Sequence, residues 1–379
     1  MVEMPDSSER QFRFYDNREK YLLFVSTCSE KKVIAERIAM DIRGLRPGPP
    51  ALRVFDAGMG DATVLTRLMR DLHRRYPTVP FLIVGKEISQ EDIRLSLEKM
   101  ADRFYEHPLT VLVVTNMLYS EAPWLHPRSS EMQARLNWLE VPLEGSTAYE
   151  FDEQISDLER IVQDWWKTTP SERTGNPLYV TPSVLVIYRQ DQEWPLAPVI
   201  PQKGDSHHEY DLIVAAQPFR ARSTARVKVR NVLAPLARSL APGGCMVVIQ
   251  STGKDPGMEI IRGIWPSADP FRTPRQELLR ELSTQLGDSH PELRFLSYPD
   301  SRAQFRYDLR LPPSELETTI STSTVLAAWN AATYVAQIED ERLRPAMSQG
   351  DYIDVTSEVL QKYQGLWFVD ESFNVARVA

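Results

Sequence analysis

A short acidic and glycine-containing stretch follows directly on the apolar residues 52–55, and its sequence is Asp56-Ala57-Gly58-Met59-Gly60-Asp61. Glycines at 58 and 60 allow a tight turn and let a ligand approach the backbone where a Cβ would otherwise stand. Glu87 closes the next apolar run, residues 81–84. A carboxylate in that place can accept hydrogen bonds from both hydroxyls of a ribose. These residue types therefore predict a site for a nucleoside-containing cofactor.

The elements around this stretch would bring the glycines and the acid together. Residues 62–75 carry apolar side chains at helical spacing with arginines on the other face, and Tyr76-Pro77 ends the helix. Residues 52–55 and 81–84 are typical of buried strands. The chain thus reads strand, glycine turn, helix, strand, acid. Ligands of open α/β sheets bind outside the carboxyl ends of the strands, where both features fall.

The spacing D-x-G-x-G, starting at Asp56, resembles the first motif of the class I S-adenosylmethionine-dependent methyltransferases. A second stretch, residues 240–244 with the sequence LAPGG, is similar to the turn that leads into the fifth strand of that family. The recognisable motifs span residues 53–251 without the segment 120–208. The resemblance implies an S-adenosyl-L-methionine cofactor. It also implies an α/β fold: a Rossmann-like, doubly wound, mostly parallel seven-stranded sheet, with an N-terminal helical lid and a large insertion.

The same resemblance assigns candidate binding residues by position. The methionine end of the cofactor falls to Asp56, Ala57, Gly58, Gly60 and Asp61, the ribose to Glu87 with Ile88, and the adenine to Thr115, Asn116 and Met117. A turn at the end of a strand is the alternative reading of Asn116.

The transfer site is expected at Gln217, Pro218 and Phe219, which follow the apolar run 210–216. Gln217 and Pro218 are also among the candidate cofactor-binding residues. Enzymes of the family that methylate amino groups of nucleobases or glutamine often carry Asn or Asp before Pro-Pro-Tyr or Pro-Pro-Phe here. Ala216 stands in the place of that polar residue, so this chemistry is not supported by the motif, although Gln217 could still bond a nitrogen or an oxygen. The catalytic candidates are Tyr21, Gln217 and Phe219.

Four regions are expected. Residues 1–50 would form the helical lid, with Tyr15 or Tyr21 reaching into the cofactor site; amphipathic helices that simply pack on the main domain are the alternative. Residues 51–119 and 209–311 would form the cofactor-binding core. Residues 120–208 would shape the substrate site or an interface, and residues 312–379 would be helical and return to the sheet edge.

Composition describes an ordinary soluble protein: 379 residues, 42% hydrophobic and 25% charged, with a net charge of −8 that argues against a general nucleic-acid binder. Cys28 and Cys245 are far apart, so neither a disulfide framework nor a metal site is expected. The polar N-terminus and the lack of a long apolar run predict a cytoplasmic protein without membrane partner. The expected partner is a small-molecule methyl acceptor, and a homodimer is left open.

Two other functions remain open from the sequence. A catalytically silent cofactor-binding or regulatory protein would keep the fold, and Ala216 and the long insertion are compatible with it. An NAD(P)-dependent oxidoreductase would need a third glycine where Thr63 stands. A finer resemblance, to the histamine N-methyltransferase group, rests on residues 24–38 and 76–89. The acceptor atom, whether N, O or C, is not determined by the sequence.

Overall fold

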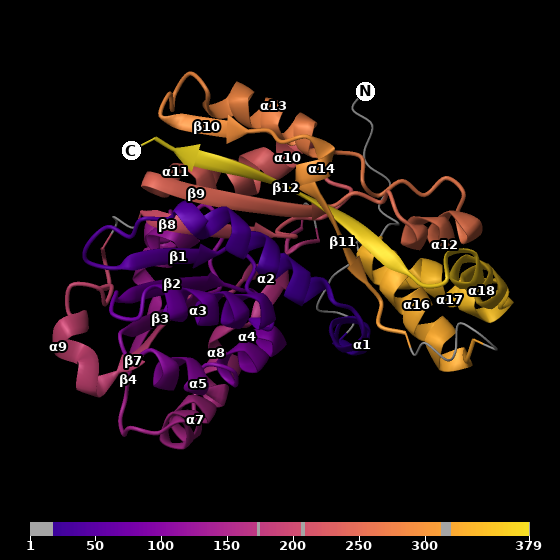
Figure 1. The fold of residues 1–379 in the computed structure, drawn as a ribbon. Coiled ribbons are helices and arrows are strands. Elements are labelled where there is room, and N and C mark those ends of the chain that lie inside the picture. The colour runs from indigo at the N-terminus through magenta and orange to yellow at the C-terminus, as the bar shows by residue number, and fades with distance from the viewer. Residues whose placement is uncertain (1–17, 173–174, 206–208, 312–319, 379) are drawn as a thin grey trace.

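The structure, a computed structural model, describes residues 18–172, 175–205, 209–311 and 320–378. A ten-stranded sheet forms its centre (Figure 1). Its strands are β1 (Leu52–Asp56), β2 (Phe81–Lys86), β3 (Thr110–Thr115), β4 (Asn137–Leu143), β7 (Ser183–Arg189), β8 (Tyr210–Ala216), β9 (Leu240–Ser251), β10 (Leu293–Leu296), β11 (Gln304–Asp308) and β12 (Trp367–Arg377). A separate hairpin pairs β5 (Thr168–Pro170) with β6 (Pro177–Tyr179).

The strands follow the order β10-β12-β9-β8-β1-β2-β3-β7-β4, with β11 paired to β12. The five strands from β3 to β9 in the middle of this order are parallel to one another. They enter the chain as third, second, first, fourth and fifth, which is the doubly wound, Rossmann-like arrangement. Strand order reverses between β1 and β8, so the crevice at their carboxyl ends is the expected ligand site.

The sheet has three strands more than the seven that the sequence predicts: the segment 120–208 adds two, and β11, beside β12, is the third. Strand β7 pairs antiparallel with β3, and β4 pairs parallel with β7. The C-terminal strand β12 also takes a different place from the one expected. It lies between β9 and β10, antiparallel to both, rather than at the edge, because it is long enough to pair with β9, β10 and β11.

Helices cover both faces of the sheet because successive residues of each buried strand point to opposite sides. Val54 packs on one face and Phe55 on the other. The Val54 face is covered by α2 (Glu30–Asp41), α3 (Thr63–Arg75), α4 (Gln90–Leu97), α5 (Ala101–Glu106), α7 (Ala148–Ser156) and α8 (Glu159–Trp165).

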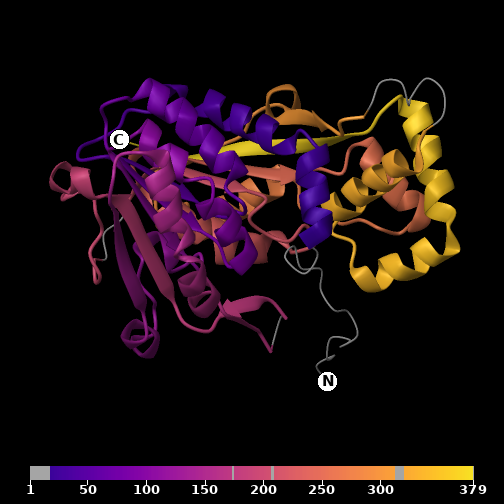
Figure 2. The same cartoon turned by 90° about the horizontal axis from the view of Figure 1, so that it is seen from below.

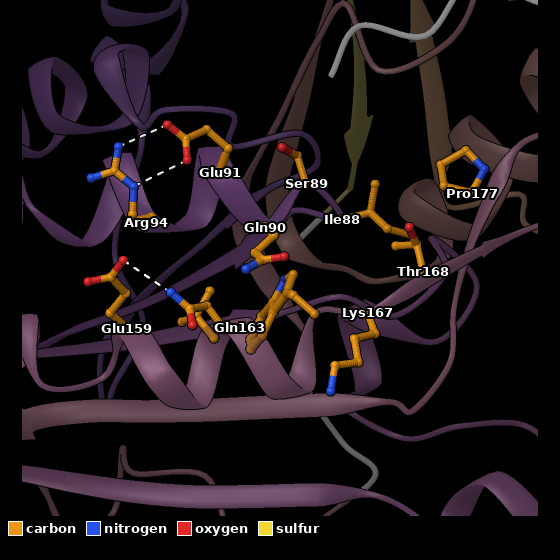
Figure 3. Close-up of a pocket in the computed structure, with 12 residues that line it drawn as sticks. Ile88, Ser89, Gln90, Glu91, Arg94, Glu159, Gln163, Lys167, Thr168 and Pro177 are labelled. Carbon is orange, nitrogen blue, oxygen red and sulfur yellow. Dashed lines mark hydrogen bonds and ion pairs between the residues drawn. The ribbon is translucent and has the colours of Figure 1, made fainter. Parts of the chain in front are cut away.

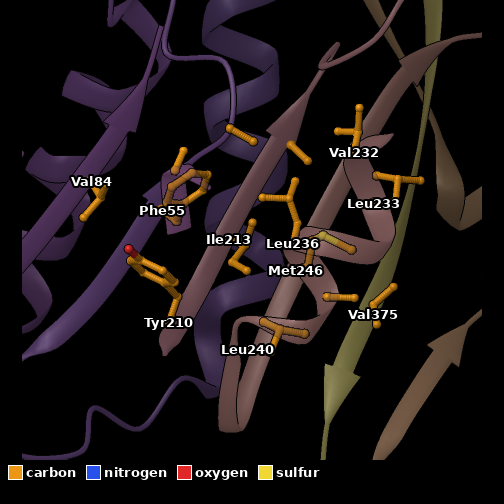
Figure 4. Close-up of a cluster of buried hydrophobic side chains, with 14 of the residues drawn as sticks. Phe55, Val84, Tyr210, Ile213, Val232, Leu233, Leu236, Leu240, Met246 and Val375 are labelled. Carbon is orange, nitrogen blue, oxygen red and sulfur yellow. The ribbon is translucent and has the colours of Figure 1, made fainter. Parts of the chain in front are cut away.

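The opposite face carries the core drawn in Figure 4, where Phe55, Tyr210 and Ile213 meet Leu236 and Met246. Its helical cover comes from α9 (Glu193–Leu196), α10 (Ala225–Lys228), η5 (Val229–Leu233), α11 (Ala234–Arg238) and α13 (Arg275–Leu286). Short helical turns elsewhere are η2 (Ile42–Gly44), η3 (Ala122–Trp124), α6 (Ser130–Ala134), η4 (Gln190–Gln192) and α14 (Asp300–Ala303).

A third buried cluster lies beyond one end of the sheet, where the C-terminal helices gather (Figures 1 and 2). It joins α1 (Arg18–Thr27) to α12 (Pro256–Ile264), α16 (Thr322–Val335), α17 (Asp340–Gln349) and α18 (Asp351–Tyr363). The ring of Phe24 on α1 lies 4.7 Å from that of Tyr334 on α16. The N-terminal helix is therefore anchored on the C-terminal helices. Over the described residues, no helix combines the length and apolar character that crossing a membrane requires.

Candidate functional site

A small cavity opens at the carboxyl ends of β1 and β8, where the strand order reverses. Eleven residues line it: Lys31, Ile34, Asp56, Gly58, Met59, Gly60, Asp61, Val64, Val214, Ala216 and Gln217. Five of the predicted site residues are among them, namely Asp56, Gly58, Gly60, Asp61 and Gln217. The cavity thus occupies the position where doubly wound sheets bind their ligands.

Glu87 reaches from the end of β2 to the glycine turn after β1. Its Oε2 accepts a 2.9 Å hydrogen bond from the Gly60 backbone N–H. Its Oε1 accepts from the N–H groups of Ile88, at 2.7 Å, and Ser89, at 2.9 Å. Gly60 has a φ of +52°, a left-handed conformation that favours glycine. The two halves of the motif predicted from sequence are therefore in direct contact.

The glycine turn is bonded to both strands that flank β1, and on the β2 side the Met59 N–H donates to the Lys86 carbonyl oxygen at 3.1 Å. The Ala57 N–H donates to the Val214 carbonyl oxygen of β8 at 2.8 Å, and the Gly58 N–H lies 3.4 Å from Asp56 Oδ1. Burial raises the pKa of Asp56 to about 7; the Gly58 hydrogen bond opposes this shift and the charge of Glu87 adds to it. Asp56 can therefore hold or release a proton near neutral pH.

Asp61 caps the first turn of α3. Its Oδ1 accepts from the Thr63 N–H at 3.2 Å, and its Oδ2 accepts from Thr63 Oγ1 and Lys99 Nζ, both at 2.6 Å. Burial alone would raise the pKa of Asp61, but the hydrogen bonds from Lys99 and Thr63 and the charge of Lys99 lower it to about 2. Asp61 is therefore a permanent anion at the cavity wall. Ala62, the residue between, has a left-handed φ of 58°.

Helices α1 and α2 cover the cavity from the N-terminal side. Lys31, in the first turn of α2, lines it and pairs with Glu30 at 3.2 Å. The Tyr21 hydroxyl from α1 lies 3.4 Å from where a Cβ on Gly60 would stand. Burial raises the pKa of Tyr21, and the nearby Asp61 carboxylate adds to the shift. Tyr21 thus reaches the glycine turn, whereas Tyr15 lies outside the described residues.

Lys31 was not among the residues predicted for the site. No local pattern in the sequence distinguishes it from the neighbouring Lys32, and its position depends on how α2 packs against α3. A lysine ammonium in a cavity lined by Asp56 and Asp61 is suited to a ligand that carries a carboxylate.

Of the residues predicted for adenine, Thr115 is the last residue of β3, and Asn116 and Met117 follow it. The Asn116 side chain is fully engaged: its Nδ2 donates to the Trp165 and Thr181 carbonyl oxygens at 3.2 and 3.0 Å, and its Oδ1 accepts from the Ser183 N–H at 2.9 Å. This geometry matches the alternative reading of Asn116 as a strand-end residue. The Glu87 N–H donates to the Thr115 carbonyl oxygen at 2.9 Å, so this strand end adjoins the ribose candidate. Met117 is fully buried.

A second pocket begins at Ile88 and Ser89 and extends between α4 and α8 to the β5–β6 hairpin (Figure 3). The indole N–H of Trp166, in the wall of this pocket, donates to the Glu87 carbonyl oxygen at 2.9 Å. Charged side chains at the rim are paired, as in the contact between Arg94 and Glu91. The segment 120–208 therefore supplies one wall of a pocket next to Glu87.

The three residues predicted for methyl transfer face different surroundings in the structure. Gln217 lines the cavity, and its backbone N–H donates to the Ile249 carbonyl oxygen at 2.9 Å. The Pro218 carbonyl oxygen accepts from the Tyr119 hydroxyl at 2.9 Å. Phe219 packs against the core on the Phe55 face, with Lys228 Nζ 4.7 Å from the centre of its ring, and does not line the cavity. Tyr119, which the sequence did not indicate, therefore supports this loop.

Neither a family model nor a curated protein matches the sequence. Solved structures do match the fold, at low similarity. One is a protein of Galdieria sulphuraria described as a sarcosine dimethylglycine methyltransferase, with 10% identity, coverage of 92% of this chain and 85% of that one, and a TM-score of 0.37. Another is a geranyl diphosphate methyltransferase, with 11% identity, coverage of 92% and 78%, and a TM-score of 0.32.

A third match is phosphoethanolamine N-methyltransferase 2 of Haemonchus contortus, with 11% identity, coverage of 97% of this chain and 61% of that one, and a TM-score of 0.31. The chain has the doubly wound, Rossmann-like fold that the resemblance to class I methyltransferases implies. With TM-scores below 0.5, the functional assignment depends on the strand order and the cavity.

Proposed function

We propose that the protein is an S-adenosylmethionine-dependent methyltransferase that acts on a small-molecule acceptor. The observation that carries this proposal is the contact between Glu87 and Gly60 beside the cavity at the strand-order reversal. Through this contact, the Glu87 carboxylate, which is suited to bind a ribose, lies beside the glycine turn, whose backbone a ligand can approach closely. The cofactor, when bound, would supply a methyl group from its sulfonium. The rest of the cofactor would then leave as a neutral thioether.

The residues of the cavity have separable roles in this proposal. Glu87 would hold the ribose, and the backbone of Gly58 and Gly60 would let the methionine end lie against the turn. Lys31 would face its carboxylate, and Asp61 would face its amino group. The task of the protein would be to position the two reactants in line and exclude water, because the cofactor is already activated.

The charges at the site suit a ligand that carries both an amino group and a carboxylate. Asp61 is ionised and paired with Lys99, Lys31 lines the same cavity, and Glu87 and Asp56 lie nearby. A dinucleotide would instead bring the two negative charges of a pyrophosphate against these carboxylates. The sheet also departs from the dinucleotide-binding order, in which the sixth strand continues directly from the fifth. Here β12 stands antiparallel between β9 and β10. Both observations disfavour the NAD(P)-dependent oxidoreductase.

Further parts of the proposal follow from the sequence. We place the protein in the cytoplasm, divide it into the regions 1–50, 51–119 with 209–311, 120–208 and 312–379, and leave a homodimer open. Residues 120–208 would shape the substrate site or an interface, and they supply one wall of the pocket next to Ile88.

The direct test is calorimetry with S-adenosylmethionine and its demethylated product, with NAD⁺ and NADP⁺ as controls. The expected result is binding of the first two alone, with a dissociation constant on the order of micromolar. Preference for a nicotinamide cofactor, or no binding of either class, would refute the proposal. Binding without transfer to any of a panel of amines, phenols and acids would favour the catalytically silent alternative.

A further inference from the structure

The side chain of Gln217 is held in one orientation by two neighbouring strands. Its Nε2 donates to Ser251 Oγ at the end of β9, at 2.9 Å, and to Asp370 Oδ2 on β12, at 3.2 Å. Both amide hydrogens are therefore used. Among the described residues, no partner is recorded for Gln217 Oε1. The amide thus offers a hydrogen-bond acceptor, not a donor, to the cavity that Gln217 lines.

The backbone of Gln217 is strained in a way that fixes this arrangement. Its φ is +52°, in the left-handed region that a residue with a Cβ rarely adopts. Such conformations are unfavourable for a residue with a Cβ and persist where the surroundings enforce them, often at functional sites. The hydrogen bond from its N–H to Ile249 and those of its side chain supply that enforcement.

Asp370 is completely buried, and its second oxygen, Oδ1, has no hydrogen-bond partner among the described residues. Burial and the nearby carboxylate of Glu30 raise its pKa. A proton on Oδ1 leaves Oδ2 free to accept from Gln217, so the amide keeps the same orientation in both protonation states. Asp370 is therefore a positioning residue, which acts through Gln217.

We propose that Gln217 Oε1 accepts an N–H hydrogen bond from the methyl acceptor, and that this acceptor is a primary or secondary amine. The inference rests on the proposed function and names its substrate class. Gln217 would thus supply the polar hydrogen-bonding group that is missing at Ala216.

Only a nitrogen nucleophile keeps this hydrogen bond through the reaction. The ammonium form of the amine first gives one proton to water. The nitrogen lone pair then forms the N–C bond while the C–S electron pair moves to sulfur, and an N–H remains on the nitrogen, which becomes positive. The bond to Oε1 strengthens as that charge develops. An alcohol must lose the very proton it donates, and a carboxylate has none to donate.

The test compares three ligands of matched shape: 2-phenylethylamine, 2-phenylethanol and 3-phenylpropionate, with methylamine as a small amine that avoids any limit of size. Binding is measured by calorimetry, with and without the demethylated cofactor, and methyl transfer is measured separately. We expect the amines alone to bind and to be methylated. Equal or preferred binding of the alcohol or the acid would overturn the inference, as would failure of both amines in a protein that binds the cofactor. Failure to bind the cofactor would instead refute the proposed function.

Variants isolate the role of the carbonyl oxygen. Gln217→Met keeps the length of the side chain and removes the acceptor, so amine affinity should fall about tenfold or more while cofactor affinity changes less than about twofold. Gln361→Met, at an exposed position on α18, is the matched control. Unchanged amine affinity in Gln217→Met would overturn the inference.

Asp370→Asn tests the positioning role. An asparagine can donate to Gln217 Oε1, which allows the Gln217 amide to rotate so that Oε1 and Nε2 exchange places. The KM for the amine should therefore rise more than kcat falls. Asp370→Glu, which keeps a carboxylate acceptor, should restore part of the loss. Thermal melting of each variant separates this effect from unfolding. Equal losses in Asp370→Asn and Asp370→Glu at unchanged melting temperature would remove Asp370 from the mechanism.

Discussion

Replacement of Glu87 by glutamine should weaken binding of S-adenosylmethionine while leaving the shape of the site almost unchanged. Glutamine keeps a carbonyl oxygen for the N–H groups of Ile88 and Ser89, which Glu87 Oε1 accepts at 2.7 and 2.9 Å. Its NH₂ group would face the Gly60 N–H, which now donates to Oε2 at 2.9 Å. Two donors would then oppose each other at the glycine turn, and a ribose would lose one charged acceptor.

The size of the effect follows from these bonds. A hydrogen bond to a charged group contributes about 1.5–3 kcal/mol. Loss of one such bond to the ribose corresponds to a dissociation constant about 10- to 150-fold higher. Glu87→Ala should weaken binding by more than about tenfold as well, because it removes every acceptor of the side chain.

Calorimetry of wild type, Glu87→Gln and the control Glu98→Gln would measure this change. Glu98 lies at the end of α4, and its side chain is about half exposed. A dissociation constant for S-adenosylmethionine that Glu87→Gln leaves within twofold of wild type would refute the ribose role. An equal loss in Glu98→Gln would show that the effect is not specific to the site.

Three further predictions concern stability. Gly257→Ala should destabilise the fold by about 1–3 kcal/mol, because its Cβ would lie 2.3 Å from the buried ring of Phe368. Lys99→Met should lower stability at pH 7 by about 1–2 kcal/mol, allowing for the partial exposure of Lys99, and should have little effect near pH 2. Its partner Asp61 has its pKa lowered to about 2, so its contribution exists above the usual pKa and is lost as pH falls toward 2. His73→Phe should remove a slope of up to roughly 1.4 kcal/mol per pH unit from the stability between about pH 6.5 and 3. Burial and the charges of nearby groups lower the pKa of His73 to about 3, so the unfolded chain takes up the proton first and acid destabilises the native state.

Urea unfolding at a series of pH values measures all three. Gly48→Ala is the control for Gly257→Ala, since nothing lies within 4 Å of the Cβ it would add. Equal stability of the two alanine variants would contradict the clash. A Lys99→Met loss that persists undiminished at pH 2 would contradict the ion pair. An unchanged slope in His73→Phe would mean that other groups cause the acid sensitivity.

The sequence by itself predicted the strands and the glycine turn around the candidate cofactor site, because these features are built from local signals. Strands β1 and β2 begin at Leu52 and Phe81, as the apolar runs indicated, and the glycines mark the turn between β1 and α3. Each of these features reports the geometry of adjacent residues, and parallel strands must bring their carboxyl ends to one edge. The approach of Glu87 to Gly60 follows from that constraint.

The surroundings of Gln217, Lys31 and Asn116 were decided by tertiary structure alone. Gln217 is oriented by Asp370, which lies 153 residues further along the chain on β12. No local sequence pattern predicts that β12 lies between β9 and β10. Lys31 enters the cavity because α2 packs over α3. Asn116 was read as a ligand residue with a strand-end alternative, and its hydrogen bonds go to carbonyl oxygens of the segment 120–208.

The physical reason is the same in each case. Apolar periodicity and turn residues encode conformation over a few residues, whereas contacts between distant segments depend on which surfaces bury one another. Two added strands, β4 and β7, join the sheet because β7 pairs with β3, which lies outside the segment 120–208, and β4 pairs with β7. The sequence therefore determined the cofactor turn, and the packing of distant strands and helices determined what faces it.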